Sequence, residues 1–209
     1  VAACQKGIMV PPGVSFVFFN QKAKDVQSSL KLVSSYWDWA PRINPDYYYK
    51  YFGGTAPTHH LYGLNVALDM ILKEGIEAVW RRHEVLASAI WAAIESWEKG
   101  GELKANIKDK KLRSAAVTSL QVQTPKGTHI RKWLQANTGL TIGIGLGMAT
   151  PNDPNGDGYF RLGHMGHVNA QMIMALIATL ETAMIAVGVP HGNNAINKAA
   201  SIIAKFSKP

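Results

Sequence analysis

The chain has 209 residues, of which 47% are hydrophobic and 17% are charged. This composition can bury a core in one or two domains, and it excludes an intrinsically disordered protein. The net charge of +8 is scattered apart from a basic run at residues 104–113, which predicts a solvated loop or sheet edge, and no nucleic-acid motif accompanies it. The only cysteine, Cys4, excludes an internal disulfide.

The first part of the chain predicts a strand, a helix and an aromatic loop. Residues 14–19 form an apolar run typical of an interior strand, and residues 21–32 suit a helix on its surface. Tyrosines and tryptophans are frequent between residues 36 and 52, where Pro41 and Pro45 interrupt any regular element. Such side chains need a surface to pack against, which is a ligand, a second subunit or the core of this chain.

Two long helices are expected next, over residues 61–73 and 76–99. The second repeats apolar residues at helical spacing and carries charged residues on its other faces. Glu74 and Gly75 separate the two helices. We therefore expect one domain over residues 1–75 and another over residues 76–209.

The rest of the chain alternates strands and helices, as in a small α/β domain. Strands are expected over residues 117–122, 141–146 and 160–162, and a helix over residues 128–137. Residues 170–189 are apolar on nearly every side and long enough to raise the question of a membrane span. Polar residues within this run, Glu181 among them, favour a soluble helix buried on both sides between the domains.

Lys6 lies in the most informative local pattern. It stands between Gln5 and Gly7, and a Pro-Pro-Gly turn at residues 11–13 leads into the predicted strand. Most lysines are solvated surface residues. Because apolar residues and turn formers surround this one, the pattern also fits a desolvated lysine whose neutral amine can form a Schiff base.

Two other residues suit anionic ligands. Arg161 stands in an apolar strand, and a buried arginine needs an anion, which is either a ligand carboxylate or an Asp or Glu of the protein. Thr55 follows two glycines in a turn. The amides and hydroxyl of such a turn can cradle a phosphate, or the turn can be purely structural.

Three further patterns resemble motifs without matching them. The glycines at 143, 145 and 147 lack dinucleotide-binding spacing, so they indicate strand glycines that allow a close backbone approach. Residues 153–158 begin like a calcium loop, but His164 stands where the liganding glutamate belongs, so a turn is expected. The histidines are numerous but lack zinc-ligand spacing, and no metal is expected.

Three segments resemble class V aminotransferases, the fold-type I pyridoxal-phosphate enzymes that include alanine-, serine- and aspartate-glyoxylate aminotransferases. They are CQKGIMVPPGVSF at 4–16, YFGGTAPTHHLYGL at 51–64 and YFRLGHMGHVN at 159–169, in the family's order and at about its spacing. The resemblance covers essentially the whole chain. It implies an α/β fold in which residues 1–75 end the large cofactor domain and residues 76–209 form the small C-terminal domain. It also implies that the chain is the second half of an enzyme.

The resemblance implies roles for individual residues. Lys6 would bind pyridoxal 5'-phosphate as a Schiff base and then move protons as a free base. Gln5 and Thr55 would help to bind the cofactor, Thr55 through the phosphate of the neighbouring subunit's site. Arg161 would bind the substrate α-carboxylate. The family often has a phosphate-binding tyrosine where this chain has Phe52, which cannot donate a hydrogen bond.

The activity that the resemblance implies is transamination between alanine, serine or aspartate and a small 2-oxo acid such as glyoxylate or pyruvate. The alternatives are pyridoxamine-pyruvate transamination, another pyridoxal-phosphate activity on this scaffold, or a non-catalytic α/β binding module. The expected partners are the N-terminal half of the same enzyme and further copies in a homodimer or higher homo-oligomer. Neither nucleic acid nor a membrane is expected as a partner. No signal peptide is visible, and the expected location is the cytoplasm.

Overall fold

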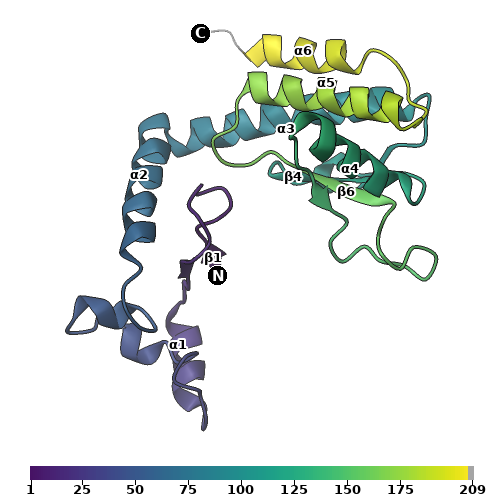
Figure 1. The fold of residues 1–209 in the computed structure, drawn as a ribbon. Coiled ribbons are helices and arrows are strands. Elements are labelled where there is room, and N and C mark those ends of the chain that lie inside the picture. Colours follow the sequence, from purple (N-terminus) through teal and green to yellow (C-terminus); the bar gives the residue numbers. More distant parts are fainter. Residues whose placement is uncertain (207–209) are drawn as a thin grey trace. The chain divides into compact units, whose positions relative to one another are not determined.

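The computed structural model describes residues 1–206 and divides into two compact units. The first unit ends at Lys73 and the second begins at Glu74. The division falls at the junction between two long helices, α2 (Thr58–Glu74) and α3 (Ile76–Glu98) (Figure 1).

The first unit has a small core. Its β1 (Ala2–Ala3) pairs antiparallel with β2 (Ser15–Phe16), and its buried cluster consists of Cys4, Val10 and Ala67. The strand predicted over residues 14–19 is wrong beyond Phe16, because no described strand pairs with residues 17–19 and their apolar side chains are exposed.

The helices of the first unit bury little within this chain. Asn20 caps α1 (Gln21–Ser29) by accepting a hydrogen bond from the backbone N–H of Ala23, and the helix ends three residues earlier than predicted. None of its residues is buried, and α2 buries only Ala67. Two 3-10 turns, η1 (Ala40–Arg42) and η2 (Tyr48–Tyr51), interrupt the loop between these helices.

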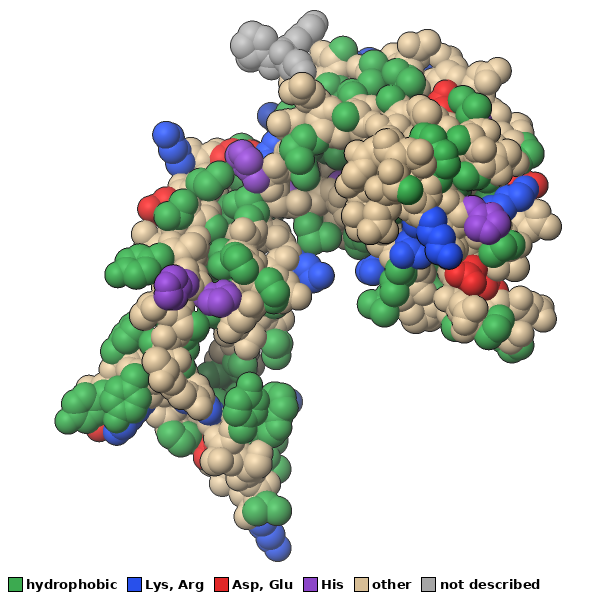
Figure 2. Space-filling model, in the orientation of Figure 1, with side chains coloured by type: hydrophobic (Ala, Val, Ile, Leu, Met, Phe, Trp, Pro, Cys, Tyr) green, Lys and Arg blue, Asp and Glu red, His purple; other side chains and the backbone are tan. Residues whose placement is uncertain are grey.

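The aromatic side chains of this loop remain largely exposed. Trp37 is 76% exposed and Tyr36 is 68% exposed, and they contact each other edge to face with ring centroids 5.1 Å apart. Figure 2 shows hydrophobic side chains at the surface around α1 and before α2. The interpretation of these aromatic residues as a lid over the core of this chain is therefore wrong. The remaining interpretations are that they pack against a ligand or against a second subunit.

The second unit places a helical layer on one face of a four-stranded antiparallel sheet (Figure 1). The strand order is β3-β4-β6-β5, and the longest pairing joins the two central strands over five residues each. The strands are β3 (Lys104–Ala105), β4 (Val117–Gln121), β5 (Gly143–Ile144) and β6 (Tyr159–Gly163). The basic run at 104–113 therefore lies at a sheet edge, as predicted, and continues into η3 (Lys110–Leu112).

Four helices form the main core together with the sheet. They are α3, α4 (Lys126–Thr138), α5 (Ala170–Ala186) and α6 (Ala195–Phe206), the last of which the sequence analysis missed. Alternate residues of the central strands, Leu120, Phe160 and Leu162, point into this core and pack with helical residues such as Trp97 and Ile90. Their strand neighbours therefore face the opposite side of the sheet.

Helix α5 buries one stripe, which contains Ile173, Ile177 and Leu180. Met172 is 51% exposed and Ile185 is 67% exposed, so the predicted burial on both sides is wrong for this chain. Among residues 1–206, no helix is both long enough and apolar enough to cross a membrane.

Candidate functional site

Lys6 lies in a short loop whose base is closed by the backbone of Cys4. The N–H of Cys4 donates to the carbonyl of Val14 at 3.1 Å, and its carbonyl accepts from the N–H of Val10 at 3.1 Å. The buried Cys4 thiol donates to the carbonyl oxygen of Pro11 at 3.2 Å. These contacts hold the two ends of the loop together and leave Lys6 in the turn between them.

The side chains of Lys6 and Gln5 are exposed. The burial that the neighbouring apolar residues predicted for Lys6 is therefore wrong for this chain, because Val10 packs with Cys4 and Ala67 rather than around the lysine. An exposed primary amine is open to attack on an aldehyde, which is the contact that Schiff-base attachment needs.

Thr55 ends an exposed bend that leads into α2. Two residues into this helix, His60 reaches back to the loop of Lys6, and its Nε2 lies 2.9 Å from the carbonyl oxygen of Pro12. A Cβ atom at Gly13 would lie 2.5 Å from the same nitrogen, so only glycine leaves room for this contact. The sequence analysis assigned no role to His60. No hydrogen bond joins Thr55 to Lys6 within residues 1–206.

Arg161 occupies the middle of β6, opposite Ser119 of β4 and Gly143 of β5. Its side chain is half-buried, and its Nε donates to the carbonyl oxygen of Ile144 at 2.8 Å. In the part of the chain that the structure describes, no carboxylate forms an ion pair with Arg161. An internal salt bridge, one of the two expected explanations, is therefore absent among residues 1–206, where the terminal guanidinium nitrogens have no anionic partner.

Gly143 makes room for this arrangement. A Cβ atom at this position would lie 3.3 Å from the Cβ of Arg161 and 3.4 Å from its Nε and Nη2. Gly145 likewise faces Tyr159, since its Cβ would lie 2.5 Å from the Cβ of the tyrosine. The prediction of a close backbone approach is confirmed for Gly143 and Gly145. It is wrong for Gly147, which lies in a turn with a φ of 73° and has open space where a Cβ atom would lie.

His164, just beyond β6, is fully buried. Desolvation lowers its pKa from the usual 6.5 to about 4, which keeps the ring neutral near pH 7. Its Nδ1–H donates to the carbonyl of Ala115 at 3.0 Å, and Nε2 accepts from the hydroxyl of Thr118 at 2.8 Å. The Nε1–H of Trp91 donates to the same hydroxyl oxygen at 3.0 Å. This network fixes the end of β6 against β4 and α3.

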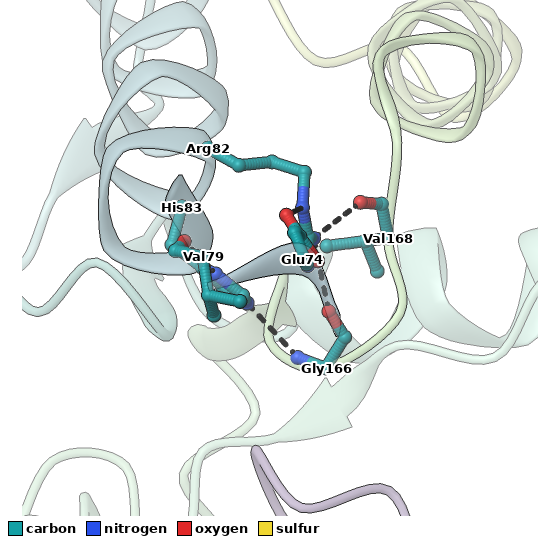
Figure 3. Close-up of polar contacts among 6 residues, drawn as sticks. All are labelled: Glu74, Val79, Arg82, His83, Gly166 and Val168. Carbon is teal, nitrogen blue, oxygen red and sulfur yellow. Dashed lines mark hydrogen bonds and ion pairs between the residues drawn. The ribbon is translucent and has the colours of Figure 1, made fainter. Parts of the chain in front are cut away.

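Arg82 contacts the residues that follow β6 from the other side (Figure 3). Its Nη1 donates to the carbonyl oxygens of Gly166 and Val168 at 3.1 and 2.7 Å. Its Nε and Nη2 form a two-point contact with the Glu74 carboxylate at 2.6 and 2.9 Å. These hydrogen bonds, together with the charge of Arg82, lower the pKa of Glu74.

His83 holds the same segment through a third group. Its Nε2 accepts the backbone N–H of Gly166 at 3.0 Å, and its Nδ1–H donates to the carbonyl oxygen of Val79 at 2.7 Å (Figure 3). The sequence analysis assigned a role to neither Arg82 nor His83. No local pattern in the sequence indicates these contacts, because the groups that they join lie more than 80 residues apart.

The calcium-like segment is a turn, as predicted. The carboxylate of Asp153 accepts the backbone N–H groups of Gly158 and Asp157 at 2.8 and 2.9 Å and the hydroxyl of Thr124 at 3.1 Å. These bonds, that from Gly158 first, lower the pKa of Asp153. Over residues 1–206, no three His, Cys, Asp or Glu side chains gather closely enough to hold a metal ion.

The sequence matches a family model and several curated proteins. The model for aminotransferase class-V matches residues 1–155. Serine-glyoxylate aminotransferase of Methylorubrum extorquens is 32% identical, over 90% of this chain and 46% of that protein. L-aspartate-glyoxylate aminotransferase of Paracoccus denitrificans is 31% identical, over 91% of this chain and 46% of that protein. The chain thus spans about half the length of the curated relatives it matches.

Solved structures confirm the predicted fold class. Ureidoglycine-glyoxylate aminotransferase from Bacillus subtilis superposes with a TM-score of 0.78 at 21% identity, over 97% of this chain and 51% of that one. Pyridoxamine-pyruvate aminotransferase from Mesorhizobium loti superposes with a TM-score of 0.76 at 25% identity, over 96% and 50%. The α/β, fold-type I architecture covers essentially the whole chain and half of each of these proteins.

Proposed function

The chain belongs to the class-V aminotransferase family, and from that premise we propose that it supplies the second half of a pyridoxal-phosphate-dependent aminotransferase. The reaction moves an amino group from alanine, serine or aspartate to glyoxylate or pyruvate. Relatives named serine-glyoxylate and L-aspartate-glyoxylate aminotransferase support this substrate class. The observation that carries the proposal is the exposed amine of Lys6 in a closed loop of the matched segment.

Three residues of the first unit suit pyridoxal 5'-phosphate. The exposed amine of Lys6 fits its aldehyde, and the exposed side chains of Gln5 and Thr55 fit its phosphate. When bound, this cofactor supplies the electron sink for carbanion chemistry at the substrate α-carbon. Phe52 has no hydroxyl to offer the phosphate, so Thr55 carries more of that contact.

Two residues act on the substrate. Lys6 Nζ takes the proton from the α-carbon of the amino acid and returns a proton to the product side, as a general base and then an acid. Arg161 binds the α-carboxylate through its terminal guanidinium nitrogens, which have no anionic partner among residues 1–206. Because the contact has two points, it also orients the α-carbon–hydrogen bond.

The active protein also contains a polypeptide that matches the first half of the relatives, and a second copy of the pair. We call this complete form the assembled protein. Within it, residues 1–75 end the large cofactor-binding domain and residues 76–209 form the small one. Support comes from the exposed aromatic loop and from an apolar groove of about 560 Å³ beside α1, lined by Val26, Leu30 and Trp37 among others. Thr55 contributes to the site of the neighbouring copy.

A substrate panel tests the proposal on the assembled protein. Turnover of alanine, serine or aspartate with glyoxylate or pyruvate, with the new amino acid identified by mass, is the expected result. Turnover only with pyridoxamine and pyruvate would favour the second candidate, which the similarity to the Mesorhizobium loti structure supports. Absence of turnover with every pair would favour a binding module and overturn the proposal.

A further inference from the structure

We propose that Glu74, Arg82 and His83 are positioning residues for Arg161. They fix residues 163–168, here called the β6 exit loop, and thereby set the direction in which Arg161 meets a carboxylate. The inference rests on the proposed function, because it takes the substrate carboxylate as the ligand of Arg161.

Gly166 is the point where α3 holds the β6 exit loop. It is buried and has a φ of 85°, a left-handed conformation that glycine adopts without strain. Its N–H donates to Nε2 of His83, and its carbonyl oxygen accepts from Nη1 of Arg82. Two consecutive helical residues therefore hold both backbone polar groups of one glycine, which fixes the loop in position and in rotation.

The guanidinium of Arg82 uses all three of its nitrogens. Its Nε and Nη2 donate to the Glu74 carboxylate, and its Nη1 donates to the carbonyl oxygens of Gly166 and Val168 (Figure 3). The two side chains are only 19% and 33% exposed, so water screens this pair less than an ordinary surface ion pair. Because the fork is planar and rigid, the position of Glu74 determines where the two carbonyl groups are held.

His83 acts as an acceptor because its other nitrogen is a donor. Nδ1–H is committed to the carbonyl oxygen of Val79, one turn earlier in α3, so Nε2 carries the lone pair that Gly166 N–H requires. The ring is thereby oriented by its own helix before it meets the loop.

The β6 exit loop continues the strand of Arg161 directly. Gly163 is the last residue of β6 and pairs with Val117, and the backbone N–H of His164 donates to the carbonyl of Ala116 at 2.9 Å. A displaced loop would shift the end of β6 along β4. Arg161 lies two residues before that end, with its Nε tied to the carbonyl of Ile144, so the shift would turn the guanidinium.

A purely structural role is the alternative, because the Glu74–Arg82 pair also spans the turn between α2 and α3. Gly75 in that turn has a φ of 88° and gives α3 no side-chain cap. A structural role predicts a loss of stability alone. A positioning role predicts in addition a selective loss for substrates that carry a carboxylate.

The test compares Arg82→Lys, Glu74→Gln and His83→Gln with the control Arg81→Lys in the assembled protein. Arg81 is the exposed neighbour of Arg82, and its change preserves charge in the same way. The measurements are KM and kcat for an amino acid and for an amine of similar size without a carboxylate, together with Tm and the cofactor absorbance. The ratio of KM values for the two substrates separates carboxylate recognition from general damage.

We expect Arg82→Lys to raise KM for the amino acid by about tenfold or more, the order that small misplacements produce, with the amine and the absorbance little changed. Glu74→Gln should give a smaller change of the same kind, because its amide oxygen still accepts, and Arg81→Lys should give none. If Arg82→Lys does not fold, Glu74→Gln and His83→Gln decide.

A lower Tm with an unchanged KM ratio in these variants would overturn the inference, as would an equal change in Arg81→Lys. Arg161→Lys distinguishes a failure of the inference from a failure of the proposed function. A changed ratio in Arg161→Lys with unchanged ratios in the other variants defeats the inference alone. Wild-type protein that turns over no amino acid defeats the proposed function itself.

Discussion

The loop that carries Lys6 and the strand that carries Arg161 differ in how much of their surroundings this chain supplies. Around Lys6 the buried cluster has three residues, and the lysine itself is exposed. Behind Arg161 lies the main core, and side-chain networks centred on His164 and Arg82 fix the strand end. The comparison teaches that the surroundings of Arg161, the proposed carboxylate-binding residue, are organised within residues 1–206, whereas Lys6 has few neighbours there.

Separating this chain from the rest of the assembled protein should therefore cause the largest loss of aminotransferase activity. We expect the 22.8 kDa polypeptide alone to be inactive, because Lys6 is exposed and the proposed function places further parts of the site outside this chain. Size-exclusion chromatography with an activity assay on each fraction checks this. A monodisperse isolated monomer with full activity would show that the contrast between the two regions has no functional meaning.

Lys6→Ala should cause the second largest loss of activity, with turnover reduced by a factor on the order of 10²–10⁴ or more. The reason is that no other base is positioned to replace the amine. The Tm should stay close to that of the unaltered protein, since the side chain is exposed and makes no packing contribution in this chain. Calorimetry and a turnover assay on the assembled protein provide both numbers. Turnover near the unaltered level would refute the assignment of Lys6.

Arg161→Lys should lower kcat/KM for amino acids, with a loss of transition-state stabilisation of about 2–4 kcal/mol. The reason is that the point charge of an ammonium group replaces the planar, two-point guanidinium. The hydrogen bond to the carbonyl of Ile144 is the only one that Arg161 makes through its side chain among residues 1–206, so the Tm should fall little. Kinetics with an amino acid and with an amine lacking the carboxylate check the specificity. Equal losses for both substrates would speak against carboxylate binding.

The pH dependence of stability reports on the packed region behind Arg161. His164 has a folded-state pKa of about 4, below the usual 6.5. Between these values the unfolded chain binds a proton that the folded one does not, so the unfolding free energy falls as pH drops from 6.5 towards 4, by at most about 3 kcal/mol. Denaturant titrations of the assembled protein should show this slope, and His164→Asn should flatten it. An identical slope in both would contradict the buried neutral state.

Gly143→Ala should have the smallest effect, about tenfold in kcat/KM by analogy with small misplacements of a binding group. The added methyl group would lie 3.3–3.4 Å from the side chain of Arg161, which must move slightly to accommodate it. Gly139→Ala is not a matched control because of its φ of 71°, whereas Gly163 has open space around its Cβ and no positive φ. Gly163→Ala should therefore leave kcat/KM unchanged, and equal losses in both variants would remove the special role of Gly143.

The sequence predicted the elements of the second unit, which contains the main core, more accurately than those of the first unit. Helix α3 begins at the predicted residue and ends one residue early, because its apolar periodicity reflects the core that it covers within the same chain. The run at residues 14–19 has the same apolar character, but only residues 15 and 16 pair, because hydrophobicity does not reveal whether a partner strand is present.

The candidate site divides in a similar way. Lys6, Thr55 and Arg161 were candidates from their local residue patterns, each with a structural alternative, whereas the role of Gln5 came from the family resemblance alone. Arg82 and His83 act on backbone groups more than 80 residues away, and such contacts leave no local pattern. The exposure of Lys6 could not be predicted either, because burial depends on tertiary packing rather than on adjacent residues.

Borohydride reduction of the assembled protein, followed by peptide mapping, tests the central claim most directly. Reduction converts a Schiff base into a stable secondary amine, so the phosphopyridoxyl group stays on the residue that held it. We predict one labelled peptide, with the label on Lys6, and none in Lys6→Ala. A label on another lysine, or a protein that carries no label after incubation with pyridoxal 5'-phosphate, would contradict the account.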